Sequence, residues 1–218
     1  KEKIINYAIV AINNLKTKNL NLLDFSFGNL IFTGIFIGEN KNFNSSIKNF
    51  AKIINNNVEI INVSSNSNRW LVAVNKKNKI IQSESKLVNK KQLSSIKDIY
   101  LLNDKNYDYF NKNFFKISKN KKNIFLKKNK DIPKINNEAK KAILNSNYII
   151  YGPGTQFSSL FPSYMICEKT IKKSKAKKIL IMNLHQDNDI IGLGTKEITI
   201  QALKYLNCLI KTLQLIAL

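Results

Sequence analysis

The sequence contains few histidines, cysteines, arginines, prolines and glycines. It holds one histidine (His185), two cysteines, three prolines, seven glycines and, among 36 basic residues, a single arginine, Arg69. One histidine leaves little material for a catalytic triad or a histidine-rich metal site, and the chain has no G-x-S-x-G motif of a serine hydrolase. Cys167 and Cys208 lie far apart in apolar helical contexts, so we expect buried free thiols in a reducing cytoplasm rather than a disulfide scaffold.

Long hydrophobic runs are also missing. No stretch approaches about eighteen consecutive apolar residues, so the sequence predicts no membrane span. The first residues, KEKIINYAIVAINNLK, lack the small-residue cleavage site of a signal peptide. What is present is typical of a globular chain, with 44% hydrophobic residues, 12 Phe and 8 Tyr. We expect the 218 residues to form one α/β domain over residues 1–218.

Acidic residues are scarce as well, and the formal net charge is +22. An excess of this size is frequent in proteins that bind nucleic acid. Here the charge comes almost entirely from lysine, scattered among asparagines as in KNKKNIFLKKNK, whereas arginine is the residue that contacts bases and phosphates in a bidentate way. We therefore interpret the lysine excess as compositional drift. We expect no nucleic-acid partner, and we expect the charge to favour an anionic small ligand.

The first part of the chain shows helical patterns up to residue 55 and strand-like patterns after it. Apolar residues at helical spacing predict helices over residues 1–16, 29–38 and 43–55. The second of these is apolar all round, so we expect it to be buried and to begin at the N-cap candidate Asn29. Short β-rich runs predict strands over residues 58–64, 70–74, 79–83 and 96–102, the middle two forming a hairpin around KKNK. Residues 103–123 are expected to form a surface insertion with some helix, followed by a strand at 123–128.

The last third of the chain has the clearest order. Helices and strands alternate there, over residues 136–144, 148–151, 162–173, 178–183 and 195–207. A β-α-β-α succession implies right-handed crossovers, so we expect the buried strand 148–151 to lie parallel to strand 178–183, with ligands at the carboxyl ends of both. The apolar tail LIKTLQLIAL is a candidate seam for a homo-oligomer.

One loop carries the strongest chemical signal. The strand YIIY continues into the turn G-P-G, and hydroxyl residues follow. Glycine lets a backbone approach an anion closely, so the amides of Gly152, Gly154 and Thr155 and the hydroxyl groups of Thr155, Ser158 and Ser159 are candidates for holding phosphate. The alternative is an ordinary strand-to-helix turn with a serine-rich start.

Two further segments are candidates for ligand contacts. In SFGNL a glycine before Asn29 opens the second helix, and the alternative to a binding role is a simple N-cap. The segment MNLHQDNDIIGLG follows the second parallel strand, and Asn183 lies there at the position expected for a ligand contact. Asp187 and Asp189 are candidates for holding Mg²⁺ or a ribose hydroxyl.

Taken in chain order, these segments are similar to a known family. SFGNL, an apolar helix, a V-x-x-x-x-V-S strand, a hairpin, YIIYGPGTQFSSLFP and KILIMNL together resemble the 2-phospho-L-lactate transferase (CofD-like) superfamily, from about Phe25 to Asn207. The G-P-G loop, with Ser159 and Pro162 in place, is the most specific part. Gly154 and the residue after it favour the YvcK-like (gluconeogenesis factor) branch over the transferase branch.

The chain also departs from the pattern of that branch. Phe25 stands where YvcK-like proteins usually have histidine, and Thr155 replaces a serine. The glycine-rich G-G-x-G loop of the family's first strand and the Asp-rich metal segment after it are not in this sequence. We therefore expect the chain to correspond to the later part of a family member.

The resemblance implies a Rossmann-like three-layer α/β/α fold with a mainly parallel sheet and a β-hairpin excursion. It also implies binding of a nucleotide diphosphate or nucleotide-sugar, with Ser26, Gly28 and Asn29 contacting phosphate or sugar. YvcK-like members bind UDP-sugars. The transferase branch moves a phospholactyl group from a guanosine diphosphate carrier to a deazaflavin alcohol, with Mg²⁺. The alternatives for this chain are a transferase of phosphorus-containing groups, and a regulatory or structural domain that has lost ligand binding.

Overall fold

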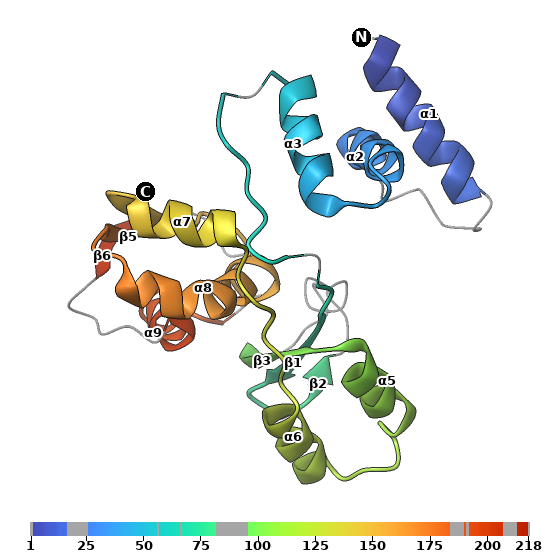
Figure 1. The fold of residues 1–218 in the computed structure, drawn as a ribbon. Coiled ribbons are helices and arrows are strands. Elements are labelled where there is room, and N and C mark those ends of the chain that lie inside the picture. Colours follow the sequence, from blue (N-terminus) through green and yellow to red (C-terminus); the bar gives the residue numbers. More distant parts are fainter. Residues whose placement is uncertain are drawn as a thin grey trace. The chain divides into compact units, whose positions relative to one another are not determined.

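The structure of the chain is a computed structural model that describes residues 2–16, 26–55, 57–65, 67–81, 96–183, 190, 192–206 and 213–217. The chain divides into two compact units, Lys1–Asn66 and Ser67–Leu218 (Figure 1). The first unit is helical, and the second combines helices with two small sheets. None of the described helices is both long enough and apolar enough to cross a membrane.

The N-terminal unit consists of α1 (Glu2–Lys16), α2 (Phe27–Gly38) and α3 (Phe43–Ile53). These helices confirm the three that the apolar spacing predicts. α1 packs on α2, and α2 packs on α3. Ala8, Ile31 and Ile35 form the buried core between them. Ile31 and Ile35 are four residues apart and therefore share one face of α2.

The start of α2 differs from the prediction. Ser26 Oγ accepts a hydrogen bond from the backbone N–H of Asn29 at 3.2 Å, so Ser26 and not Asn29 is the N-cap. An N-cap residue lies just before the helix, and its side chain accepts the N–H of a residue in the first turn. Asn29 supplies that N–H and therefore lies inside the helix. The predicted segment 29–38 is also not buried all round, because Asn29 and Gly38 are exposed and Phe32 and Phe36 are only half-buried.

The crossing of α1 and α2 is tight at one glycine. A Cβ atom added at Gly34 would lie 1.9 Å from the carbonyl oxygen of Tyr7. By contrast, a Cβ at Gly38, one turn later, would touch only the Tyr7 ring, at 4.0 Å. Gly34 therefore lets the two helix backbones approach closely, and the sequence analysis did not single it out.

The C-terminal unit begins with an antiparallel sheet in the order β2-β1-β3. Its strands are β1 (Trp70–Asn75), β2 (Ile80–Ile81) and β3 (Ile96–Leu102). β1 and β2 confirm the predicted hairpin, and Asn75 closes its turn by accepting the N–H of Lys79 on Oδ1 at 2.8 Å. Asn78 in this turn has a positive φ of 54°, which asparagine tolerates better than most residues.

Two helices pack on this sheet and replace a strand that the sequence predicted. They are α5 (Asp104–Lys112) and α6 (Lys119–Lys128). Residues 123–128 therefore belong to a helix, and the predicted strand there is wrong. Leu126 is fully buried among Val72, Leu102 and Phe110, whereas Ile124 is 63% exposed. The apolar run is thus split between two faces of a helix whose lysines favour helical structure.

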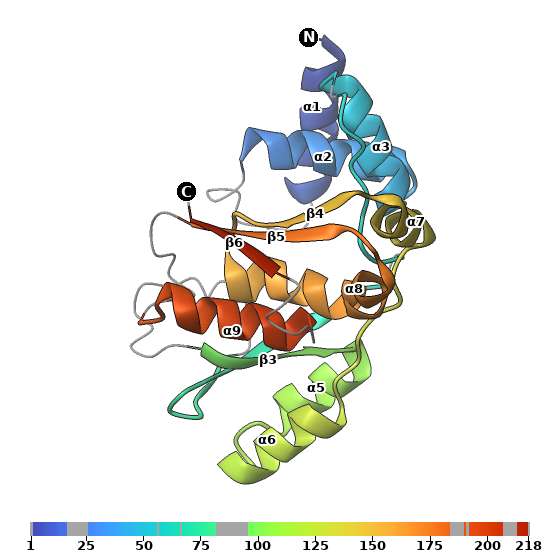
Figure 2. The ribbon, with the colours of Figure 1, turned by 90° about the vertical axis from the view of Figure 1, so that its left-hand side faces the viewer.

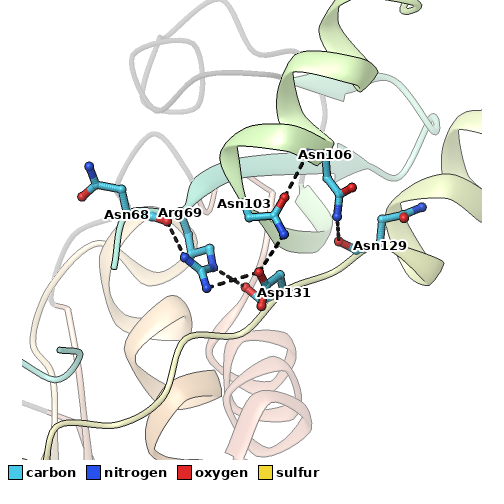
Figure 3. Close-up of polar contacts among 6 residues, drawn as sticks. All are labelled: Asn68, Arg69, Asn103, Asn106, Asn129 and Asp131. Atoms are coloured by element: carbon cyan, nitrogen blue, oxygen red, sulfur yellow. Dashed lines mark hydrogen bonds and ion pairs between the residues drawn. The ribbon is translucent and has the colours of Figure 1, made fainter. Parts of the chain in front are cut away.

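The one arginine of the chain fastens this part of the unit (Figure 3). Arg69 forms an ion pair with Asp131 (Nη2 to Oδ2, 3.2 Å) and donates from Nε to the Asp131 carbonyl at 3.1 Å. Asn103 Nδ2 donates to the same carboxylate at 2.9 Å. The start of β1, the end of β3 and the segment after α6 are therefore tied together at one carboxylate, which pairs with a forked guanidinium and accepts from a side-chain amide.

The rest of the unit holds a parallel sheet in the order β4-β5-β6. Its elements in chain order are α7 (Asn137–Asn145), β4 (Tyr148–Tyr151), the π-helical turn η1 (Gln156–Leu160), α8 (Phe161–Lys173), β5 (Lys177–Met182), α9 (Thr195–Leu206) and β6 (Leu213–Ala217). β4 and β5 are parallel neighbours joined through α8, which confirms the predicted βαβ unit.

α8 and α9 lie between the parallel sheet and β3 (Figure 2). Tyr205 on α9 accepts the N–H of Ile99 on its hydroxyl at 3.0 Å, and Lys204 pairs with Asp98. The Phe161 ring of α8 stacks on Tyr205, with centroids 4.9 Å apart. The unit is thus a mixed α/β structure in which one helical layer contacts both sheets.

Two further predictions need correction. Residues 58–64 do not form a strand: Val58 is 67% exposed, and only Ser64 makes an isolated bridge. β-branched residues favour strands only where a neighbouring strand can pair and pack with them. β4 is not buried on both faces, since Tyr148 is 57% and Ile150 58% exposed. Within the apolar tail, the backbone of β6 pairs with β5. That this tail forms the seam of a homo-oligomer stays a prediction.

Candidate functional site

The predicted phosphate loop and Asn183 meet at one edge of the parallel sheet. Because β4 and β5 run in the same direction, the residues that follow each strand lie side by side. Gly152 follows β4 with a positive φ of 84°, and a Cβ there would lie 2.6 Å from the backbone oxygen of Ile181 in β5. Glycine is therefore required at this turn by both its backbone conformation and the closeness of the neighbouring strand.

Asn183 binds the peptide groups of Gly154. Gly154 N–H donates to Asn183 Oδ1 at 2.9 Å, and Asn183 Nδ2 donates to the Gly154 carbonyl at 3.2 Å. The sequence predicted that both residues would contact a ligand directly. In this structure the Gly154 amide is instead used by Asn183, and the amide group of Asn183 orders the loop. Their direct contact with a ligand stays a prediction.

The hydroxyl groups after the turn lie at the start of a helix. Thr155 Oγ1 and Ser159 Oγ are 2.7 Å apart, so one donates to the other. Leu160 N–H donates to the Thr155 carbonyl at 3.0 Å, which is the i to i−5 spacing of a π-helical turn. A π-helical start leaves one more leading amide outside the helical ladder than an α-helical start does. Pro162 lies in the first turn of α8, as predicted.

Gln156 belongs to this loop and was missed by the sequence analysis. Its side chain is fully buried, and its Nε2 donates to the Gly154 carbonyl at 3.2 Å. Its Oε1 has no hydrogen-bond partner among the described residues. A glutamine next to a phosphate-loop candidate gives no local pattern that predicts burial, so no signal in the sequence could have found it.

A cluster of buried aromatic side chains extends from the loop to α8 and α9, and a buried thiol lies further along α8. Phe157 and Phe161 are fully buried with ring centroids 4.9 Å apart. Burial raises the pKa of the Tyr164 and Tyr205 hydroxyls above the ordinary range of tyrosine. Burial also raises the pKa of the Cys167 thiol to about 11, so it stays protonated at neutral pH. These groups are therefore suited to packing and not to acid–base or nucleophilic chemistry.

SFGNL lies in the N-terminal unit, and the polar groups of its serine form hydrogen bonds with the first turn of α2. Ser26 Oγ accepts the Asn29 N–H, and the Ser26 carbonyl accepts the Leu30 N–H at 3.1 Å. Gly28 and Asn29 are exposed in the first turn of α2. The structure thus shows the N-cap alternative, with Ser26 as the N-cap of α2. A ligand contact by these three residues stays a prediction.

The metal candidates cannot be placed. Asp187 and Asp189, and His185 beside them, lie outside the described residues. Across the ranges that the structure does describe, no three His, Cys, Asp or Glu side chains gather in the manner of metal ligands.

The geometry so far defines an α/β protein with an ordered glycine turn and a helix start at the carboxyl edge of a parallel sheet. The family model for 2-phospho-L-lactate transferase CofD matches residues 1–204. The chain therefore belongs to the CofD family, as its motifs suggested.

Solved structures agree with this fold. Two crystal structures of protein BH3568 from Bacillus halodurans, one of them described as a member of the UPF0052 family, are 20% identical to the chain. The first covers 88% of this chain and 52% of its own chain with a TM-score of 0.65, and the second covers 92% and 55% with a TM-score of 0.66. The chain thus spans about half the length of these structures. No curated protein matches it.

Proposed function

We propose that the chain binds a nucleotide diphosphate or a nucleotide-sugar, and that the loop from Gly152 to Ser159 holds the phosphate groups. The observation that carries this proposal is the hydroxyl pair of Thr155 and Ser159 at the start of a helix, directly after a parallel strand. Leading amides and the helix dipole favour an anion at such a position. Ligands of open α/β sheets bind at this edge.

The electrostatics of the chain support an anionic ligand. The net charge of +22 attracts phosphate groups at long range. The loop itself holds no lysine or arginine between Gly152 and Ser159, so specificity there rests on neutral donors. We place the protein in the cytoplasm, where a free thiol such as Cys167 stays reduced.

Other parts of the ligand are assigned from the family resemblance. Ser26, Gly28 and Asn29 are proposed to contact phosphate or sugar, and Mg²⁺ bound through Asp187 and Asp189 would neutralise phosphate charge. The described residues hold no cluster that fits the metal. No step of the proposal therefore depends on it.

A transferase of phosphorus-containing groups is the second candidate, and the family match favours it. Phosphate binding by the same loop would then position the group that is transferred. The two candidates differ in turnover and not in the first binding event, so binding is the property to measure first.

Calorimetry with GDP and with UDP-sugars tests the proposal on the 218-residue chain. Gly154→Val should abolish binding, because valine's branched Cβ blocks close approach of phosphate. The nearest atoms to its added Cβ would be those of the Leu160 side chain, at 3.6 Å, and the φ of 156° makes the substitution strained but not impossible. Circular dichroism should show a largely formed fold. Unchanged affinity in the folded variant would leave the loop as a simple strand-to-helix turn.

A further inference from the structure

The Gly154 carbonyl receives two side-chain amide donors from different elements. Gln156 Nε2 donates to it at 3.2 Å from the start of η1, and Asn183 Nδ2 donates to it at 3.2 Å from the end of β5. Asn183 Oδ1 also accepts the Gly154 N–H at 2.9 Å. Both backbone polar groups of Gly154 are thus held by side chains, and the carbonyl cannot rotate without losing two hydrogen bonds.

The direction of this carbonyl determines the direction of the next amide. The Gly154–Thr155 peptide is trans, and the C=O and N–H of a trans peptide point to opposite sides. Holding the carbonyl toward Gln156 and Asn183 therefore directs the Thr155 N–H away from them. That N–H donates to no acceptor among the residues that the structure describes.

Gln156 is costly to keep where it is. Its side chain is fully buried, and Oε1 lacks a partner among the described residues. An unpaired buried amide oxygen destabilises a fold, so stability alone does not account for a glutamine here. An isosteric apolar side chain would fill the same space without that cost.

We infer that Gln156 is a positioning residue of the phosphate loop: with Asn183 it holds the Gly154 carbonyl so that the Thr155 N–H faces an oxygen of a phosphate or pyrophosphate group. This inference rests on the proposed function and adds the donor that binds the anion. Gln156 itself does not touch the ligand. It affects the affinity for the anion by fixing the orientation of the Gly154–Thr155 peptide.

Inorganic pyrophosphate is the probe, and the amide of Thr155 is the reporter. In ¹⁵N–¹H correlation spectra of the full chain, the Thr155 amide should shift on titration with pyrophosphate. Thr155→Pro should remove binding, whereas Thr155→Ala, which keeps the amide but loses the hydroxyl group, should weaken it only about as much as Ser159→Ala does. The φ of Thr155 is −63°, which is close to the roughly −65° of proline, so the substitution suits the backbone.

Gln156→Met tests the positioning role. It should weaken pyrophosphate binding about tenfold, the loss expected for about one hydrogen bond, while the midpoint of thermal unfolding stays the same or rises. Gln201→Met on α9 is the matched control, because Gln201 Oε1 is likewise buried without a partner in the described part of the chain. It should leave affinity unchanged.

The outcomes separate the inference from the proposed function. If the wild-type chain binds neither pyrophosphate nor nucleotide, both are wrong. If it binds but the Thr155 amide does not shift, or if Thr155→Pro or Gln156→Met binds as well as wild type, only the inference is wrong. A fall in the melting midpoint of Gln156→Met at unchanged affinity would make Gln156 a structural residue and also overturn it.

Discussion

The two glycine-containing loops that stand out in the sequence, SFGNL and YGPGT, are held by different kinds of interaction. In SFGNL the contacts are local: Ser26 Oγ accepts the N–H of Asn29, three residues away. In YGPGT they are long-range, because the peptide groups of Gly154 are bound by Asn183, 29 residues away. The first loop needs only its own helix, whereas the second forms only when β4 and β5 have paired.

The glycines of the two loops also differ in how closely other parts of the chain approach them. A Cβ at Gly28 would meet nothing closer than Ser26 Oγ at 3.9 Å, whereas a Cβ at Gly152 would lie 2.6 Å from the Ile181 oxygen. Gly34, which lies outside both motifs, is the most constrained of the three, at 1.9 Å from the Tyr7 oxygen. The presence of a glycine in a recognisable motif therefore does not indicate how strongly the fold requires glycine at that position.

The largest effect is expected at the helix crossing. Gly34→Ala should lower the free energy of unfolding by about 3 kcal/mol or more, because the added methyl group meets the backbone of Tyr7 and the helices must separate. Chemical denaturation followed by circular dichroism measures it. Gly38→Ala is the control and should be neutral or stabilise by up to about 1 kcal/mol, since alanine favours helix. Equal effects of the two substitutions would mean that α1 and α2 do not cross closely.

A smaller loss of stability is expected for a substitution in the turn after β4. Gly152→Ala should destabilise by about 2–3 kcal/mol, through the unfavourable φ of 84° and the contact with the Ile181 oxygen. Gly192→Ala shares the positive φ, at 74°, but its Cβ would meet nothing within 4 Å. It should therefore cost only about 1 kcal/mol. The difference between the two melting curves isolates the contact with β5, and equal curves would argue against the close approach of loop and strand in the structure.

The sequence predicts most of the fold where the pattern is local. The three N-terminal helices, the hairpin at β1 and β2 and the parallel pair β4 and β5 follow from apolar spacing and turn residues. The strand prediction for residues 123–128 is wrong because a short apolar run such as Ile124, Phe125 and Leu126 fits a helix as well as a strand. Only the buried sheet under α6 decides between them, and that sheet comes from residues far away in the chain.

The candidate site is predictable only in part for the same reason. Glycine, threonine and serine after a strand indicate the loop, and the end of β5 indicates Asn183. That Asn183 would bind Gly154, and that Gln156 would be buried beside it, depends on the pairing of two strands and the packing of α8. Hydrogen bonds across such separations leave no trace in a single sequence.

The next prediction concerns the hydroxyl pair of the second loop. Ser159→Ala should weaken binding of a nucleotide diphosphate by about 1.5–3 kcal/mol, the value for a hydrogen bond to a charged group, and change stability little because Ser159 is exposed. Calorimetry gives the affinity and thermal melting the stability. Ser163→Ala is the control: its hydroxyl donates to the Ser159 carbonyl at 3.2 Å within the helix, and its loss should leave affinity unchanged. A loss of stability without a loss of affinity would assign the pair to helix capping.

The smallest effect is expected at the first loop. Ser26→Ala should lower stability by about 1 kcal/mol, because the N–H of Asn29 loses its acceptor. Ser118→Ala is the matched control, since Ser118 precedes α6 as an N-cap residue without a side-chain hydrogen bond and should cost less. If Ser26 acts only as a cap, Ser26→Ala leaves the affinity for UDP-sugars and GDP at the wild-type value. A weakened affinity would instead show that the Ser26 hydroxyl serves the ligand as well as the helix, as the family resemblance implies, and the contrast between the two loops would then hold for their folding but not for their function.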